Sequence, residues 1–167
     1  MKIYVERVDP ALKSAQLHEA AYALLRRVLR TDWGLPDVHI EKTPAGKPYI
    51  AGSTVHISIS HTKGLVCCAA AQTPCGVDCE YTRTASENVM RRVCTEKELR
   101  DIHAAADPAA RFMLYWTLKE SISKKRGVGL TESFQQYEIT FQNEKPVCEG
   151  HTLHIERMDG FFLAAAE

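Results

Sequence analysis

One stretch of the chain decides the fold. It runs from Val55 to Tyr81 and reads VHISISHTKGLVCCAAAQTPCGVDCEY. Apolar and polar residues alternate over 55–60, which is the pattern of a strand with one buried face. A turn then leads to the continuously apolar run 65–71, which is typical of a strand buried on both faces. Residues 76–81 follow a proline and form the next predicted strand, so the stretch predicts three strands that share a core.

Helices and further strands are predicted on both sides of this stretch. Residues 2–8 alternate weakly and predict a first strand, and apolar residues recur at helical spacing over 11–29. Two more helices are predicted over roughly 86–104 and 109–126. The last third of the chain contains three short β-like runs, at 137–141, 152–156 and 161–165. These elements predict an α+β fold with mostly antiparallel strand pairing.

The composition is that of a folded globular protein without overall charge. The chain has 167 residues, and its formal net charge is zero, so no global field draws it to nucleic acid or to an anionic membrane. No apolar run approaches the roughly 20 residues of a membrane-spanning helix, and the first residues contain no apolar signal-peptide core. The six cysteines form no C-x-x-C pair and are predicted to be reduced and buried. We therefore expect a cytoplasmic protein without nucleic-acid or membrane partners.

A first pair of acidic residues lies on the last of the three strands, in the string Gly76-Val77-Asp78-Cys79-Glu80. Positions two apart on a strand share a face, so Asp78 and Glu80 are predicted to lie side by side, with Val77, Cys79 and Tyr81 facing the core. Two neighbouring like charges favour a bound cation or a shared proton. The alternative is an exposed strand edge with solvated acids.

A second acidic position lies on the helix over 109–126. Trp116, Glu120 and Lys124 recur every four residues and share one stripe of that helix, which is apolar over much of its circumference. An ionised carboxylate in such a setting needs a partner. Two partners are open for Glu120: an ion pair with Lys124 within the helix, or a metal ion shared with Asp78 and Glu80.

Magnesium fits the second alternative better than zinc, because it takes oxygen ligands and is commonly held by carboxylates together with substrate phosphates. Lys119 and Lys124 supply compact positive charge for phosphate oxygens. Lys47 lies on a rigid Gly-Lys-Pro turn that also suits an anion, although the spacing of a Walker loop is absent. His61, beside Ser60 at the end of a strand, is a further candidate donor to a phosphate.

Four strings occur in a fixed order along the chain. They are Gly46-Lys47-Pro48; Ile57-Ser58-Ile59-Ser60-His61; Gly76-Val77-Asp78-Cys79-Glu80; and Trp116-Thr117-Leu118-Lys119-Glu120-Ser121 through Lys124 to Gly129-Leu130. Together they closely resemble the Sfp-type 4′-phosphopantetheinyl transferases. The last string is the most specific, since W-[ST]-x-K-E-[SA]-x-x-K is rare by chance, and the resemblance covers roughly residues 42–131.

The resemblance implies a specific reaction. Such enzymes move the phosphopantetheine arm of coenzyme A onto a serine of an apo carrier protein, acyl or peptidyl, and release 3′,5′-ADP. Magnesium, or alternatively manganese, is the implied metal. The implied metal ligands are Asp78, Glu80 and Glu120; the implied catalytic residues are Glu120 and Lys124; and the implied coenzyme A contacts are Lys42, Lys47, Ser60, His61, Lys119 and Lys124.

The implied fold consists of two similar α+β lobes in one chain, related as a pseudo-dimer with coenzyme A between them. The boundary is expected near residue 74, with an N-terminal lobe over 1–74 and a C-terminal lobe over 75–167 that carries the metal site. The N-terminal lobe is short for this class. A monomer is expected, because two lobes of one chain already form the cleft. A non-catalytic protein of the same fold that binds coenzyme A or a carrier is the alternative.

Overall fold

The computed structural model describes residues 1–129 and 132–167, so Leu130 at the end of the fourth string lies outside the described residues. The helices are α1 (Ser14–Asp32), α2 (Glu87–Val93), α3 (Glu96–Ala104), α4 (Pro108–Arg126) and the 3-10 turn η2 (Phe134–Gln136). The strands are β1 (Lys2–Arg7), β2 (Ile40–Lys42), β3 (Pro48–Ile50), β4 (His56–Thr62), β5 (Leu65–Ala71), β6 (Gly76–Tyr81), β7 (Thr140–Gln142), β8 (Lys145–Val147), β9 (Leu153–Met158) and β10 (Phe161–Ala166).

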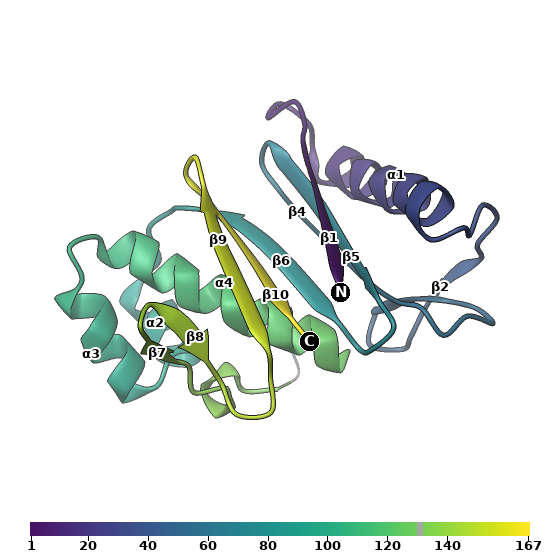
Figure 1. Ribbon diagram of the computed structural model, residues 1–167. Coiled ribbons are helices and arrows are strands. Elements are labelled where there is room, and N and C mark those ends of the chain that lie inside the picture. The colour runs from purple at the N-terminus through teal and green to yellow at the C-terminus, as the bar shows by residue number, and fades with distance from the viewer. Residues whose placement is uncertain (130–131) are drawn as a thin grey trace.

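The first half of the chain builds a three-stranded antiparallel sheet in the order β1-β5-β4. Helix α1 packs on one face of it, as Figure 1 shows, and its leucines meet the apolar side chains of β4 and β5 in one core cluster. Ile57 and Ile59 of β4 face this cluster, as the alternation predicted. The polar face of β4 is buried too, because Ser58, Ser60 and Thr62 lie at the junction with the second half of the chain, so the strand does not have the single buried face that was expected. The apolar run of β5 is buried over its whole length.

The second half builds another three-stranded antiparallel sheet in the order β6-β10-β9, and helix α4 lies against β6 and β10 (Figure 1). The two sheets meet through a shared apolar cluster that takes residues from β5, β6 and β10, including Cys67, Val77 and Leu163. The structure is therefore α+β, as expected, and every strand ladder among the described residues is antiparallel.

Strands β4 and β6 come from different sheets but lie side by side in parallel orientation. The backbone N–H of Val77 donates to Ser58 Oγ at 3.0 Å, and Ser60 Oγ donates to Asp78 Oδ1 at 2.7 Å. Thr62 Oγ1 donates to Glu80 Oε2 at 3.3 Å. Side-chain hydroxyls thus join the sheets at the seam, and this is where the acidic strand of the sequence prediction lies.

The structure corrects three details of the sequence prediction. The single helix expected over 86–104 is two helices, because Thr95 starts α3 with a capping box that it forms with Glu98. The tail contains the short hairpin of β7 and β8 where one strand over 137–141 was expected. Tyr81, expected in the core, is 37% exposed because it ends β6 at the rim of the sheet.

All six cysteines are free and buried, in agreement with the predicted reduced state. Among the described residues, no helix is long and apolar enough to cross a membrane.

Candidate active site

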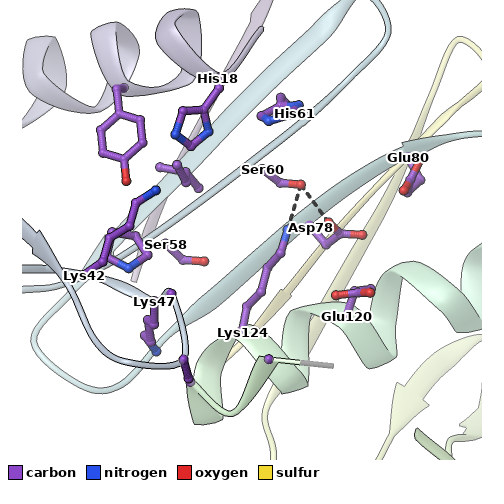
Figure 2. A pocket seen from close by; sticks show the side chains of 17 residues that line it. His18, Lys42, Lys47, Ser58, Ser60, His61, Asp78, Glu80, Glu120 and Lys124 are labelled. Carbon is purple, nitrogen blue, oxygen red and sulfur yellow. Dashed lines mark hydrogen bonds and ion pairs between the residues drawn. The ribbon is translucent and has the colours of Figure 1, made fainter. Parts of the chain in front are cut away.

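A cavity of about 390 Å³ opens along the seam between the two sheets (Figure 2). Its walls come from both halves of the chain: helix α1 and strand β4 on one side, strand β6 and helix α4 on the other, and the turn between β2 and β3 at one end. The predicted site residues in its lining are Lys42, Lys47, Ser60, His61, Asp78, Glu80, Glu120 and Lys124.

Asp78 lines this cavity and is 4% exposed. Its Oδ1 accepts hydrogen bonds from Ser60 Oγ and from Lys124 Nζ, both at 2.7 Å, and Lys124 Nζ also donates to Ser60 Oγ at 2.8 Å. Burial alone lowers the pKa of Lys124, but Asp78 and Glu120 raise that pKa above its ordinary value, so the ammonium stays charged. One residue from each of three elements, β4, β6 and α4, thus meets in a single polar cluster.

Glu80 and Glu120 line the same cavity, and each is destabilised as an anion. Burial raises the pKa of Glu80, and the charge of Asp78 raises it further. Burial raises the pKa of Glu120 to about 7, with Asp78 and Glu80 acting in the same direction and Lys124 against them. The ion pair within the helix that was considered for Glu120 is not formed among the described residues, because Lys124 pairs with Asp78.

The chemistry of these donors fits a divalent cation. Asp78 Oδ2 is buried and accepts no hydrogen bond from the described residues, so it is an unsatisfied buried acceptor. Three carboxylates at one seam repel one another, and a cation removes that cost. Asp78, Glu80 and Glu120 line one cavity, but the described residues contain no group of three His, Cys, Asp or Glu side chains close enough to share one ion.

The other end of the cavity is cationic and aromatic. Lys42 Nζ lies 5.8 Å from the ring centre of Tyr22, and the His18 ring packs edge-on against both Tyr22 and His61. Burial lowers the pKa of His61, and the charges of His18 and Lys124 lower it further, so the ring is neutral near pH 7. Figure 2 shows Lys42, His18 and His61 around one side of the cavity.

His18 and Tyr22 were missed by the sequence reasoning. Both lie on α1, four residues apart, and therefore share one face of the helix. The sequence shows their four-residue spacing, but the helix was interpreted only through its apolar residues, which form the face that packs on the sheet. The fact that α1 packs beside the acidic strand is a long-range property that local patterns do not carry.

Lys119 does not line the cavity, and its expected contact with coenzyme A phosphates is wrong in this structure. The side chain is fully buried on the opposite side of α4, where Nζ pairs with Glu98 Oε2 at 2.6 Å. It also donates to the backbone carbonyls of Val93 and Phe134, both at 3.1 Å. Adjacent residues of a helix point about 100° apart, so Lys119 cannot share the face of Glu120.

Comparisons with known proteins point to one family. Residues 74–159 match the family model described as the 4′-phosphopantetheinyl transferase superfamily. A 4′-phosphopantetheinyl transferase of Bacillus subtilis is 30% identical over 118 residues, which are 69% of this chain and 50% of that protein. The transferase Sfp of Bacillus subtilis strain 168 is 28% identical over 129 residues, 74% of this chain and 58% of that protein. The chain thus spans about half the length of the curated relatives it matches.

A vertebrate relative points to the same family, and a solved structure has a similar fold. The L-aminoadipate-semialdehyde dehydrogenase-phosphopantetheinyl transferase of Xenopus laevis is 29% identical over 146 residues, 76% of this chain and 48% of that protein. The holo-[acyl-carrier-protein] synthase of Thermotoga maritima superposes with a TM-score of 0.50 at 23% identity, over 56% of this chain and 61% of that chain. The structural likeness concerns the fold.

Proposed function

Because the chain belongs to the 4′-phosphopantetheinyl transferase superfamily, we propose that it transfers the 4′-phosphopantetheine arm of coenzyme A to a serine of an apo acyl or peptidyl carrier protein, releasing 3′,5′-ADP. One observation carries the proposal. The cavity between the sheets brings Asp78, Glu80 and Glu120 together with Lys124 and with Ser60 of the other half of the chain.

The cationic end of the cavity suits the nucleotide of coenzyme A. Lys42 offers a charge to a phosphate, and His61 offers a neutral ring nitrogen beside Ser60. Lys124 Nζ lies between this end and the carboxylates, so it is placed to neutralise the diphosphate. We assign the nucleotide contacts to four residues, which would also orient the diphosphate: Lys42, Ser60, His61 and Lys124.

The transfer itself makes one bond and breaks one bond. The carrier serine Oγ attacks the phosphorus that bears the pantetheine, and the bond from that phosphorus to the bridging oxygen breaks, so 3′,5′-ADP leaves with the electron pair. The serine proton passes to Glu120, a carboxylate that lines the cavity beside the proposed metal site. Lys124 stabilises the charge that grows on the leaving oxygen.

We assign the metal site to Asp78, Glu80 and Glu120, with magnesium as the expected ion and manganese as its substitute. When bound, the ion supplies charge neutralisation at the transferred phosphoryl group. The unpaired Asp78 Oδ2 supports this assignment, since it is the one buried carboxylate oxygen in the cavity without a hydrogen-bond partner among the described residues.

We place the boundary of two lobes near residue 74, between β5 and β6, with the cavity at their junction. We also propose that the enzyme is cytoplasmic, since its cysteines are free, and that it acts as a monomer, since residues of one chain line both sides of the cavity. Neither nucleic acid nor a membrane is a proposed partner, because the chain carries no net charge.

The test is direct. The protein is incubated with coenzyme A, magnesium and an apo carrier, and the intact mass of the carrier is measured. A gain of one phosphopantetheine group is expected with at least one carrier of fatty-acid or peptide synthesis. If no carrier gains mass although the protein binds coenzyme A, the chain is a non-catalytic member of the fold.

A further inference from the structure

Lys47 makes contacts that differ from those of a phosphate ligand. Its stem lines the cavity, but its Nζ donates to the backbone carbonyl of Lys125 at 2.6 Å and to that of Cys75 at 3.2 Å. The carbonyl of Lys125 belongs to the last turn of α4, where carbonyl groups have no partner within the helix. A cation there also meets the negative end of the helix dipole. Lys47 therefore caps a helix of the other half of the chain.

The turn that carries Lys47 is held in place by its own hydrogen bonds. The backbone N–H of Lys47 donates to Thr43 Oγ1 at 3.1 Å, and the N–H of Thr43 donates to the carbonyl of Lys47 at 2.9 Å. The N–H of Gly46 donates to the carbonyl of Thr43 at 2.8 Å. The ammonium of Lys47 thus projects from a hydrogen-bonded turn of the first half of the chain and binds backbone carbonyls of the second half.

The stem of Lys47 packs closely against the end of α4. Gly127 ends α4 in the left-handed region at φ 74°, and a Cβ there would lie 2.8 Å from Lys47 Cδ. A Cβ on Gly76, at the start of β6, would lie 2.0 Å from the carbonyl oxygen of Ser121. Backbone therefore packs on backbone where β6 meets α4, and the lysine stem lies on the glycine that ends the helix.

The two carbonyls that Lys47 binds flank the candidate site. Cys75 lies directly before β6 and precedes Asp78 by three residues, and Lys125 directly follows Lys124 on α4. Burial lowers the pKa of Lys47, and among the described residues its ammonium pairs with no carboxylate and donates to the two backbone carbonyls. The Lys47 ammonium therefore contacts the segment that carries Asp78 and the helix end that carries Lys124.

We propose that Lys47 is a positioning residue: it clamps the C-terminal end of α4 and the start of β6 to the turn between β2 and β3, and thereby sets Lys124 against Asp78 and Ser60. The expected effect on kcat rests on the proposed transfer reaction. The clamping of α4 and β6 by Lys47 does not depend on that reaction. A ligand of the coenzyme A phosphates would act mainly on substrate binding. A clamp acts mainly on the rate of the bound complex.

The test uses Lys47→Met, which keeps the stem and removes the ammonium. We expect kcat for transfer to fall by about tenfold or more, and KM for coenzyme A to stay within about threefold of wild type. Amide hydrogen exchange at the C-terminal end of α4 is expected to become faster, because the cap is lost. A KM for coenzyme A raised tenfold or more with an unchanged kcat would overturn the proposal and make Lys47 a phosphate ligand.

A control variant sharpens the result. Lys63→Met removes an exposed lysine outside the site and serves as the matched control. If wild type transfers nothing to any carrier, the proposed function fails, whereas faster exchange in Lys47→Met still supports the clamp and unchanged exchange rejects it.

Discussion

Asp78 combines two properties that are rarely found on one buried carboxylate. One oxygen accepts hydrogen bonds from a serine and a lysine, and the other is buried without a partner among the described residues. A purely structural ion pair would satisfy both oxygens, since an unmet buried acceptor costs about 1–3 kcal/mol. The unmet oxygen lies in a cavity with two more carboxylates, which is the arrangement that a bound cation would stabilise.

Lys124→Met tests the Asp78–Lys124 pair. The variant leaves Asp78 charged and buried, so we expect a loss of about 1–2 kcal/mol in the free energy of unfolding, reduced because Lys124 is 30% exposed. Transfer is expected to fall by about 100-fold or more, because the diphosphate loses its neutralising charge. Denaturant unfolding and the carrier mass assay measure the two effects. Lys145→Met, at an exposed position of β8, should change neither.

Glu120→Gln is expected to stabilise the metal-free protein at alkaline pH. The pKa of Glu120 rises on folding from 4.5 to about 7, so folding disfavours its ionised form. The wild type therefore loses stability as the pH rises between these values, and the loss is complete above the folded pKa. In a chelator at about pH 8, Gln should raise the free energy of unfolding by up to about 3 kcal/mol, and below about pH 4 the two proteins should match. A Gln variant that is less stable at pH 8 would contradict the electrostatic account of the site.

At the scale of elements, helix α4 is fixed by different chemistry on its two sides. One side presents Glu120 and Lys124 to the cavity, and the other buries Lys119 against Glu98 of α3. Glu98 also accepts from the backbone N–H groups of Thr95 and Ile139, both at 2.8 Å. This buried pair ties α3, α4 and the segment before β7 together, so it holds the helix that carries the cavity residues.

Lys119→Met should destabilise the protein by about 3–5 kcal/mol, because Glu98 would be left as an unpaired buried charge. Adding Glu98→Gln removes that charge, so the double variant should be more stable than Lys119→Met alone. Denaturant unfolding of wild type, both single variants and the double variant measures this coupling. If Lys119→Met keeps wild-type stability and loses affinity for coenzyme A, the sequence-based role of Lys119 as a phosphate ligand is restored.

The helices and strands were predicted well where their apolar residues recur at the spacing of one kind of element. Strands β4, β5 and β6 and helices α1 and α4 follow from their apolar spacing. The break between α2 and α3 was missed, although Thr95 and Glu98 have the spacing of a capping box. The β7–β8 hairpin was missed because its strands have three residues each and one contains Pro146.

The site was predicted in part, and the reason lies in how local each contact is. Asp78 and Glu80 share a face by strand period, and Glu120 and Lys124 share one by helix period. The pairing of Lys124 with Asp78 joins two distant segments, and no local pattern specifies it. Lys119 was predicted to lie beside Glu120 in the site because the two residues are adjacent in the motif. Neighbouring residues on a helix point about 100° apart, and this rotation was not taken into account.

At the scale of the whole molecule, two three-stranded sheets lie side by side, with α1 on the first sheet and α4 against the second (Figure 1). The cavity between them is lined by residues of both halves of the chain. The ends of the chain meet across the junction, where the amino group of Met1 lies 3.3 Å from Glu167 Oε1. Each half contributes residues that the other lacks: the hydroxyls come from β4 and the carboxylates from β6 and α4. One copy of the chain thus supplies both walls.

We therefore expect a monomer of 18.7 kDa in solution. Sedimentation equilibrium over a wide concentration range measures the mass, in the presence and absence of coenzyme A. A stable dimer whose dissociation abolishes transfer would show that a second copy completes the site.

The most direct test of the whole account is the transfer rate of Glu120→Gln at saturating coenzyme A and magnesium, read as the mass gain of an apo carrier that wild type modifies. The substitution removes a proposed metal ligand and the proposed base while keeping the size of the side chain. The account predicts a folded protein whose transfer rate is at least about 100-fold below wild type, with Glu156→Gln on the exposed face of β9 unaffected. A Glu120→Gln rate within twofold of wild type would contradict the assignment of the site.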